Sequence, residues 1–334
     1  MGCSSEKSLN TKEVNPQSKV DKEQEAQKNI QEEQENKQIE ENDNNDEVLY
    51  LKYETTSDNE TILLFGYEVD EFDDFTQPFY EREHDKFDLY LNDIQINDLE
   101  YTFEKKGIHT IKMVLKEKIT NFSYMFYNCD RLKGITGYID TTYVRSFFWL
   151  FNNCSSLVDI SALKRWNITN VRTFDFMFNK CSSLADISPL KDWDMSGDKS
   201  ITSMFSGCAS LKNIKPLENW NVSNYGTLNY FFSKCSSLED ISPLKKWNVS
   251  NTRNFLYMFS ECSSLKDISP LKNWDVSKGE YFRFMFYKCS SLTDASPLYE
   301  WDITNGKNFS GMFEKCPSLK NVEELKNKFG DDII

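Results

Sequence analysis

A cysteine that returns at fixed intervals is the feature that most limits how this chain can fold. The cysteines after Cys3 are Cys129, Cys154, Cys181, Cys208, Cys235, Cys262, Cys289 and Cys316. The first interval between them is 25 residues, and the next six are 27 residues each. Such a period is typical of repeat architectures, in which each unit buries its apolar face against its neighbours. We therefore expect eight stacked coils over residues 119–334.

Apolar residues keep their places relative to each cysteine, which we number as position 0. Phe stands at position −3 and Leu at position +3 in every coil. Trp stands at position +12 in six successive coils: Trp166, Trp193, Trp220, Trp247, Trp274 and Trp301. We expect these positions to point inward, so that like residues stack on like from coil to coil. The cysteines share this apolar face and are predicted to be buried, reduced thiols.

The Met-Phe segment before each cysteine permits two interpretations. Phe122, Met125, Phe126 and Cys129 have the spacing of one helical face, and an Asn, Ser or Thr stands at position −8 in seven coils. These signals favour a short capped helix. Position −5 is aromatic in six coils: Tyr124, Trp149, Phe176, Tyr230, Tyr257 and Phe284. A strand would bury this column, whereas a helix would expose it as an aromatic stripe suited to interaction.

Two shorter signals follow each cysteine. The segment from position +3 to +6 predicts a short strand, and Ser-Pro-Leu after it predicts a helical turn. Position +5 carries a column of aspartates: Asp159, Asp186, Asp240, Asp267 and Asp294. Aspartate directly before a turn can hydrogen-bond the turn, whereas an exposed column of carboxylates can contact a ligand or a cation. Both roles stay open, and we count these residues with the aromatic column as candidates for a ligand face.

The chain before the coils divides into an acidic tail and a second segment. Residues 1–47 carry 13 acidic and 6 basic side chains and little to bury, which predicts a disordered tether. Residues 48–118 show the alternation of strands and predict a small β-rich cap module. Within it, residues 48–69 predict a hairpin around Thr55–Glu60. The array itself has a net charge near zero, so we expect no nucleic-acid partner.

The first residues suggest a membrane anchor. Gly2 fits the start of an N-myristoylation signal and Cys3 is a natural palmitoylation site, although Glu6 stands where that signal has Ser or Thr. Two acyl chains anchor a protein stably. We see no signal peptide after Met1. The expected location is therefore a membrane, on its cytosolic face if Gly2 is myristoylated. Alternatively, Cys3 begins a mature bacterial lipoprotein at the cell surface.

The segment from Met258 to Ser277, MFSECSSLKDISPLKNWDVS, resembles the BspA-like leucine-rich repeats, and the resemblance covers about residues 119–325. It implies an α/β fold, a leucine-rich-repeat solenoid of about eight coils, with a protein-binding or adhesive role at a cell surface. It implies no enzymatic activity. The residues agree, because no phosphate-binding glycine pattern is present and two histidines leave no plausible triad.

We therefore expect no catalytic, metal or cofactor site and no small-molecule substrate. The expected function is protein binding by a membrane-tethered repeat protein. The alternative is a structural protein that self-associates in a cortical or surface layer.

Overall fold

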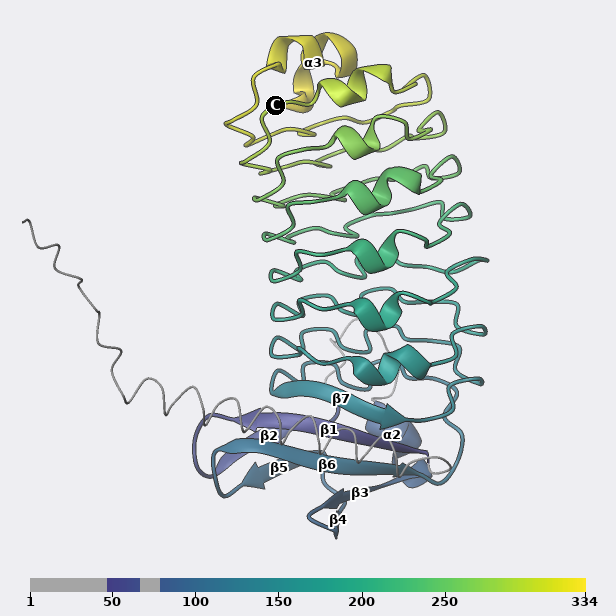
Figure 1. The fold of residues 1–334 in the computed structure, drawn as a ribbon, viewed down its shortest axis with the longest axis vertical. Helices are drawn as coiled ribbons and strands as arrows, with labels where there is room; N and C mark the ends of the chain where they lie inside the picture. Colours follow the sequence, from purple (N-terminus) through teal and green to yellow (C-terminus); the bar gives the residue numbers. More distant parts are fainter. Residues whose placement is uncertain (1–46, 67–78) are drawn as a thin grey trace, which may run out of the picture. The chain divides into compact units, whose positions relative to one another are not determined.

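The structure is a computed structural model that describes residues 47–66 and 79–334. The chain divides into two compact units, Met1–Asn45 and Asp46–Ile334. The first unit, which holds most of the predicted tether, lies outside the described residues. In the second unit, strands occupy one end of a stack of coils and a helix occupies the other end (Figure 1). No helix of the described residues combines the length and apolarity needed to cross a membrane.

Two sheets form the N-terminal end of this unit. The larger sheet has the strand order β4-β3-β6-β1-β7, and every pairing in it is antiparallel. Its strands are β1 (Val48–Thr55), β3 (Phe87–Leu91), β4 (Ile94–Ile96), β6 (Gly107–Leu115) and β7 (Leu132–Tyr138). The smaller sheet pairs β2 (Glu60–Leu63) with β5 (Glu100–Phe103). Two short helices, α2 (Phe79–Glu83) and η1 (His84–Lys86), precede β3.

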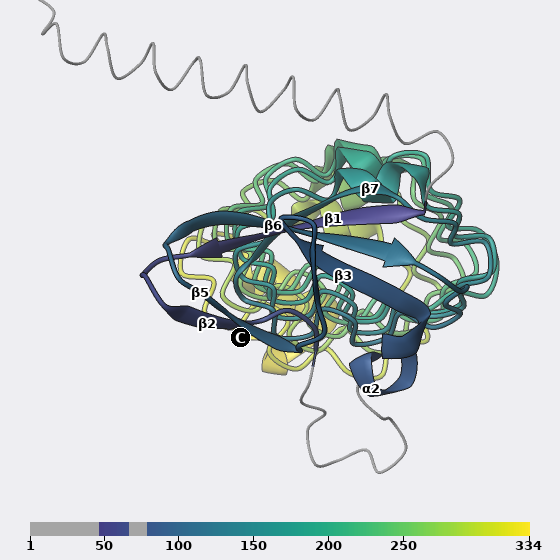
Figure 2. The ribbon, with the colours of Figure 1, turned by 90° about the horizontal axis from the view of Figure 1, so that it is seen from below.

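The larger sheet continues directly into the coils. Strand β7 belongs to the first coil, and it pairs with β1 on one edge. On its other edge Gly134 forms a parallel bridge with Asp159 of the second coil. Seen from below, the strands lie across the end of the stack (Figure 2). The sheet thus covers apolar residues that the first coil would otherwise expose, as terminal units of repeat arrays require.

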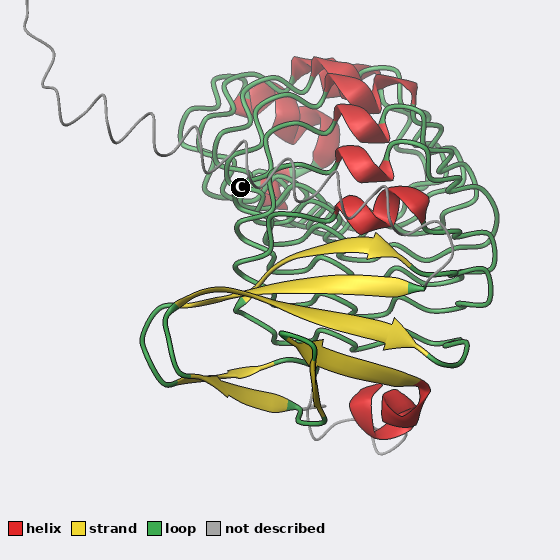
Figure 3. Cartoon of the chain, turned by 60° about the horizontal axis from the view of Figure 1, so that its bottom comes forward, coloured by secondary structure: helices red, strands yellow, loops and turns green. Residues whose placement is uncertain are grey.

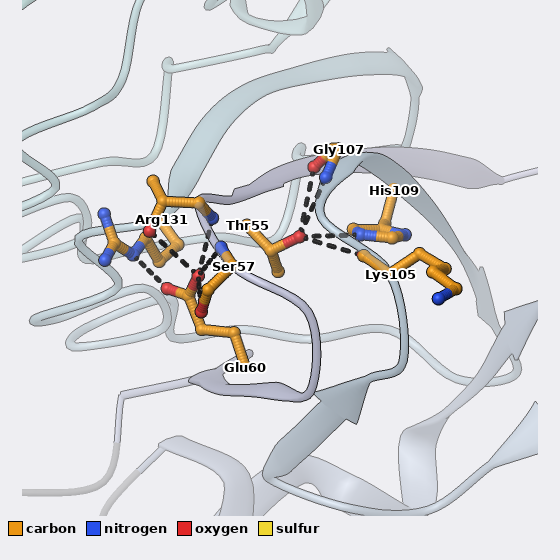
Figure 4. Close-up of polar contacts among 8 residues, drawn as sticks. Thr55, Ser57, Glu60, Lys105, Gly107, His109 and Arg131 are labelled. Carbon is orange, nitrogen blue, oxygen red and sulfur yellow. Dashed lines mark hydrogen bonds and ion pairs between the residues drawn. The ribbon is translucent and has the colours of Figure 1, made fainter.

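The predicted hairpin is wrong, because β1 and β2 belong to different sheets. Strand β1 lies between β6 and β7, where both of its edges are paired. A carboxylate holds the connection between β1 and β2. Glu60 Oε2 accepts hydrogen bonds from the Thr56 and Ser57 N–H groups at 2.5 and 3.0 Å, and Glu60 Oε1 lies 2.8 Å from Arg131 Nε (Figure 4). This contact also ties the turn to the first coil.

The Met-Phe segment forms a run of tight turns, so the predicted capped helix is wrong. The residues at positions −5 and −1 have positive φ in all eight coils, whereas an α-helix needs negative φ throughout. In the sixth coil the Met258 N–H donates to Phe255 O at 3.2 Å, and the Cys262 N–H donates to Phe259 O at 3.2 Å. A positive φ at the third residue is the mark of a type II turn.

Hydrogen bonds between coils explain why turns replace the helix. The N–H groups of alternate residues point along the stack and reach carbonyls of the next coil. In the sixth coil the Phe255 N–H donates to Tyr281 O at 2.8 Å, and the Phe259 N–H donates to Met285 O at 2.9 Å. An α-helix would use these donors internally. The short strand expected from position +3 to +6 occurs in the first coil alone among the described residues, as β7.

Ladders of identical side chains fill the core, as the repeat pattern predicts. The Phe rings at position −3 are buried, and most neighbouring pairs stack nearly parallel, as Phe259 and Phe286 do with centroids 5.6 Å apart. The eight cysteines of the array are free and buried, which confirms the predicted thiols. Each from the second coil onward donates its S–H to the carbonyl of the Phe at position −3 of the preceding coil, as Cys262 does to Phe232 O at 3.2 Å.

Four Ser-Pro-Leu segments form the predicted helical turns, and so do Ser-Ala-Leu and Lys-Pro-Leu at the equivalent positions of the second and fourth coils. These are 3-10 helices on one side of the stack (Figure 3). They are η2 (Ser161–Arg165), η3 (Ser188–Leu190), η4 (Lys215–Leu217), η5 (Ser242–Lys246), η6 (Ser269–Leu271) and η7 (Ser296–Glu300). Behind them the Trp indole of one coil donates to the Leu carbonyl at position +9 of the preceding coil, as Trp274 Nε1 does to Leu244 O at 3.0 Å.

A C-terminal cap that the sequence pattern did not predict closes the other end. Helix α3 (Val322–Phe329) and η8 (Asp331–Ile333) follow the last coil. The backbone of η8 supplies the carbonyls that a ninth coil would supply, since the Phe313 N–H donates to Ile333 O at 2.8 Å. Phe329 packs on Phe309 with ring centroids 5.4 Å apart.

Candidate interaction surface

The six aromatic residues predicted at position −5 do form a column along the stack. Tyr230 and Tyr257 stack with ring centroids 4.7 Å apart and 9° between ring planes, and Phe284 continues this run at 4.9 Å. In the second and third coils the ring centroids of Trp149 and Phe176 lie 5.4 Å apart. Five of the rings are half-buried, whereas Tyr124 is buried. The stripe is therefore less exposed than a helix would make it, because neighbouring rings cover each other's faces.

The backbone beneath this column is strained. Every aromatic residue in it has a φ between 55° and 64°, the left-handed region that bulky residues rarely adopt. Such a conformation costs an L-residue roughly 1–2 kcal/mol relative to the right-handed region. Glycine would relieve this cost, yet glycine occupies position −5 in the last coil alone. The large rings are therefore held at an energetic cost that glycine would avoid, and strain of this kind clusters at functional sites.

The column is interrupted in the fourth coil. Ser203 replaces the aromatic residue at position −5, and Gly207 stands at position −1 with a φ of 79°. Tyr230 of the fifth coil therefore has no ring beside it on that side. The missing side chains leave room next to the Tyr230 ring on the side of the fourth coil.

A hollow of about 340 Å³ opens beside these two tyrosines, and we call it the serine hollow. It is lined by Asn179, Lys180, Ser206, Gly207, Tyr230, Ser233, Lys234, Tyr257, Ser260 and Glu261. Its floor consists of small residues at position −2, and its walls are the tyrosines at position −5 and the charged residues at position −1. Sequence reasoning missed it, although the run of Ser at position −2 and the single Gly at position −1 are visible signals.

The hollow offers both ionic and neutral polar groups. Lys288 Nζ lies 3.3 Å from the Glu261 carboxylate, whereas Lys234 Nζ lies 4.0 Å from it. Hydroxyl groups of Ser206, Ser233 and Ser260 supply donors and acceptors on the floor. Stacked phenol rings beside hydroxyl and ammonium groups can bind an extended polypeptide by packing and hydrogen bonding together.

The five predicted aspartates lie outside the serine hollow, and each one hydrogen-bonds the backbone of the turn that follows it. Each accepts a hydrogen bond from the N–H two residues later, as Asp240 Oδ1 does from the Ser242 N–H at 2.7 Å. In four of the coils the Ser hydroxyl donates to the other carboxylate oxygen, at 2.8 to 3.0 Å. These bonds begin the 3-10 helices. None of the five aspartates lines the serine hollow, and a ligand role for them stays a prediction.

The environment of the buried thiols disfavours their reactive thiolate form. Burial is the largest cause that raises the pKa of each array thiol, and it raises the pKa of Cys316 to about 12. A thiol of high pKa is a poor nucleophile and a poor metal ligand. Over residues 47–66 and 79–334 no cluster of three or more His, Cys, Asp or Glu side chains is arranged to hold a metal ion. The lipidation candidates Gly2 and Cys3 lie outside the described residues.

Comparison with known proteins gives one family. Residues 97–214 and 199–326 each match the model of the family described as "Mycoplasma protein of unknown function, DUF285". The two matches together span more than half of the chain and contain all eight coils. No curated protein and no solved structure matches the chain.

Proposed function

We propose that this chain, which belongs to the DUF285 family of Mycoplasma proteins of unknown function, is a non-enzymatic protein-binding repeat protein of the adhesion type. The stacked coils would be a leucine-rich-repeat solenoid of the BspA-like kind, with its binding surface at the aromatic column and the serine hollow. The stacking of 27-residue units and the double family match support this proposal. The role of the solenoid is to hold a long, rigid surface toward a partner protein.

The observation that carries the proposal is the presence of strained aromatic residues around a hollow. Tyr230 and Tyr257 both occupy left-handed backbone, and both line the hollow. Aromatic side chains supply much of the binding energy in protein interfaces because they bury a large area with few rotatable bonds. Packing within the array does not require these rings, since Ser203 and Gly311 occupy the same position in other coils.

We further propose that the array is tethered to a membrane through acylation of Gly2 and Cys3. The support is the Met-Gly-Cys start, which fits dual acylation. The alternative is a cell-surface lipoprotein with diacylglyceryl on Cys3. Mass analysis of the N-terminal peptide from native cells decides between them. Myristate on Gly2 places the array on the cytosolic face, whereas diacylglyceryl on Cys3 places it outside. An unmodified peptide contradicts both forms of the tether.

Cross-linking on intact cells tests the binding surface. The protein would be compared with a variant in which Tyr230, Tyr257 and Phe284 are replaced by Ser. The expected result is loss of the cross-linked partner. The midpoint of thermal unfolding should change by no more than it does for ordinary surface substitutions. Tyr281→Ser is the matched control, because Tyr281 is an exposed tyrosine that does not line the hollow. Replacement of the five aspartates by Ala tests the turn face separately.

Two results would contradict this assignment. Capture of the same partner by the triple variant would remove the aromatic column from the binding surface. Sedimentation that shifts to larger species with increasing concentration, with no foreign partner cross-linked, would favour the self-associating layer protein instead.

A further inference from the structure

A second charged column runs along the stack at position −9. Its residues from the second coil onward are Arg145, Arg172, Lys199, Gly226, Arg253, Glu280 and Lys307. Successive members are neighbours in space, since the Arg172 N–H donates to Arg145 O at 2.9 Å and the Glu280 N–H donates to Arg253 O at 2.8 Å. Gly226 divides the column into two runs of three residues, one in coils two to four and one in coils six to eight.

The second run alternates in sign and has a net charge of +1, with one carboxylate between two cations. Glu280 lies between two cations, with Arg253 Nη1 3.1 Å and Lys307 Nζ 2.6 Å from its carboxylate oxygens. The hydrogen bond from Lys307 is the largest of the causes that lower the pKa of this carboxyl group. One carboxylate therefore satisfies the two basic side chains that flank it along the stack.

The first run has three cations in succession and no carboxylate among them. Arg145 and Arg172 are exposed, and neither forms an ion pair with any other described residue. Lys199 turns inward, and its ammonium group donates to Ile168 O and Val171 O at 3.1 and 2.9 Å. The backbones of Arg145 and Arg172 are hydrogen-bonded neighbours on adjacent coils, so their guanidinium groups extend from adjacent positions, and like charges placed this way repel unless an anion lies between them.

Arg145 also borders a hollow of about 250 Å³ whose other lining residues are Thr120, Tyr143 and Asn170. Tyr143 is 46% exposed, and the ammonium group of Lys118 lies 3.8 Å from the centre of its ring. Lys118 itself is engaged with Asp140 at 3.8 Å. The hollow offers a hydroxyl, an amide and a phenol beside the guanidinium group of Arg145.

We propose that Arg145 and Arg172 bind the carboxylates of an acidic segment of a partner protein. A bound carboxylate would lie between the two guanidinium groups as Glu280 lies between Arg253 and Lys307. Arginine suits this role because its planar group binds a carboxylate through two parallel hydrogen bonds. The inference extends the proposed function by giving the chemistry of a partner, and it uses a surface separate from the serine hollow.

Two other anionic partners fit this column less well. Lysine and arginine clusters that bind membranes usually contain about 4–8 residues, whereas this run contributes two free cations. Nucleic-acid binding needs an extended basic surface, and this column is interrupted by Gly226 and Glu280. A short run of glutamate and aspartate side chains matches both the number and the linear arrangement of the charges.

Titration of the full-length protein with a labelled polyglutamate peptide tests the proposal. The expected result is binding that weakens as salt is added, because exposed charges are screened. Replacing Arg145 and Arg172 by Gln should weaken binding by at least about tenfold. Arg172→Glu should abolish binding and also leave the protein at least as stable as the wild type, because it places a carboxylate beside Arg145 as Glu280 lies beside Arg253.

The second run provides the matched controls. Arg253→Gln should leave peptide binding unchanged, whereas Glu280→Gln should create a second weak binding position by freeing Arg253 and Lys307. Unchanged affinity in Arg172→Glu, or equal losses in the Arg145 and Arg172 double variant and in Arg253→Gln, overturns the proposal. Binding to phosphatidylserine vesicles without binding to polyglutamate also overturns it, in favour of a membrane contact.

Discussion

Two tryptophans in adjacent coils allow the contribution of one hydrogen bond to be measured inside the protein. Trp193 Nε1 donates to Leu163 O at 3.1 Å. Trp166 Nε1 is buried and has no hydrogen-bond partner among the described residues. The difference arises at the end of the stack. The first coil has Tyr138 at position +9, and its backbone belongs to β7, which pairs with β1.

The two sites are otherwise closely alike. The exposed fraction is 4% for Trp166 and 6% for Trp193, and both indoles pack on Phe147 with centroids 5.2 and 6.3 Å away. Replacing either Trp by Phe therefore removes a similar apolar area, and this loss cancels in the comparison. Trp193→Phe also loses a hydrogen bond with a net value of about 0.5–1.5 kcal/mol, whereas Trp166→Phe removes an unpaired donor that costs about 1–3 kcal/mol.

We expect Trp193→Phe to be more destabilising than Trp166→Phe by about 1.5–4.5 kcal/mol. Urea unfolding followed by circular dichroism measures this difference, provided that both variants show the same dependence of unfolding free energy on urea. Equal destabilisation by the two substitutions would refute the reasoning, because it would show that the indole hydrogen bonds add nothing to the stack beyond ring packing.

Three further predictions concern the acid stability, the turns and the thiols. Hydrogen bonds from the Thr56 N–H first, then from the Ser57 N–H and the Thr56 hydroxyl, with the charge of Arg131, lower the pKa of Glu60 to about 2. A carboxyl whose folded pKa is depressed stabilises above its unfolded pKa, and this contribution disappears as the pH falls from about 4.5 toward 2. Glu60→Gln should therefore lose less stability over that pH range than the wild type in acid titration, and a parallel loss in both proteins would contradict this. Gly207→Ala should destabilise the fourth coil by about 1–2 kcal/mol, because Gly207 has a φ of 79° and an added Cβ would lie 3.1 Å from the Lys180 backbone. Thermal unfolding measures this loss. An unchanged unfolding midpoint would show that the turn can relax to accept the side chain. Iodoacetamide should modify Cys316 first in the folded protein and the other seven array cysteines far more slowly, because Cys316 is 8% exposed and the other seven are fully buried. Peptide mass analysis checks the order, and early labelling of Cys235 would show that the middle of the stack opens.

Side-chain positions in the core were predictable from the sequence because the repeat imposes them. Once the 27-residue period is recognised, stacking of equivalent residues follows from burial of apolar surface. The Phe ladder at position −3, the buried thiols and the Ser-Pro-Leu turns all follow from that pattern. The alignment of the aromatic residues at position −5 into a column was also predictable. The serine hollow beside it was not, because it depends on the small residues Ser203 and Gly207 in the fourth coil.

The backbone of the Met-Phe segment was not predictable in this way. A residue spacing of three and four describes an α-helix and a run of tight turns equally well, because both bring such residues to one side. The choice depends on where the N–H groups find acceptors, and those acceptors lie one coil away, as Met285 O does for the Phe259 N–H.

The sequence by itself determined which residues are inside and that they repeat. The tertiary structure decided the strand pairing of β1, the turn conformation and both end caps. These features depend on hydrogen bonds between residues far apart in the chain, such as β1 with β7 or Phe313 with Ile333. Local periodicity contains no information about such partners. The same local sequence surrounds a backbone N–H group whether its acceptor lies in its own turn or in the next coil.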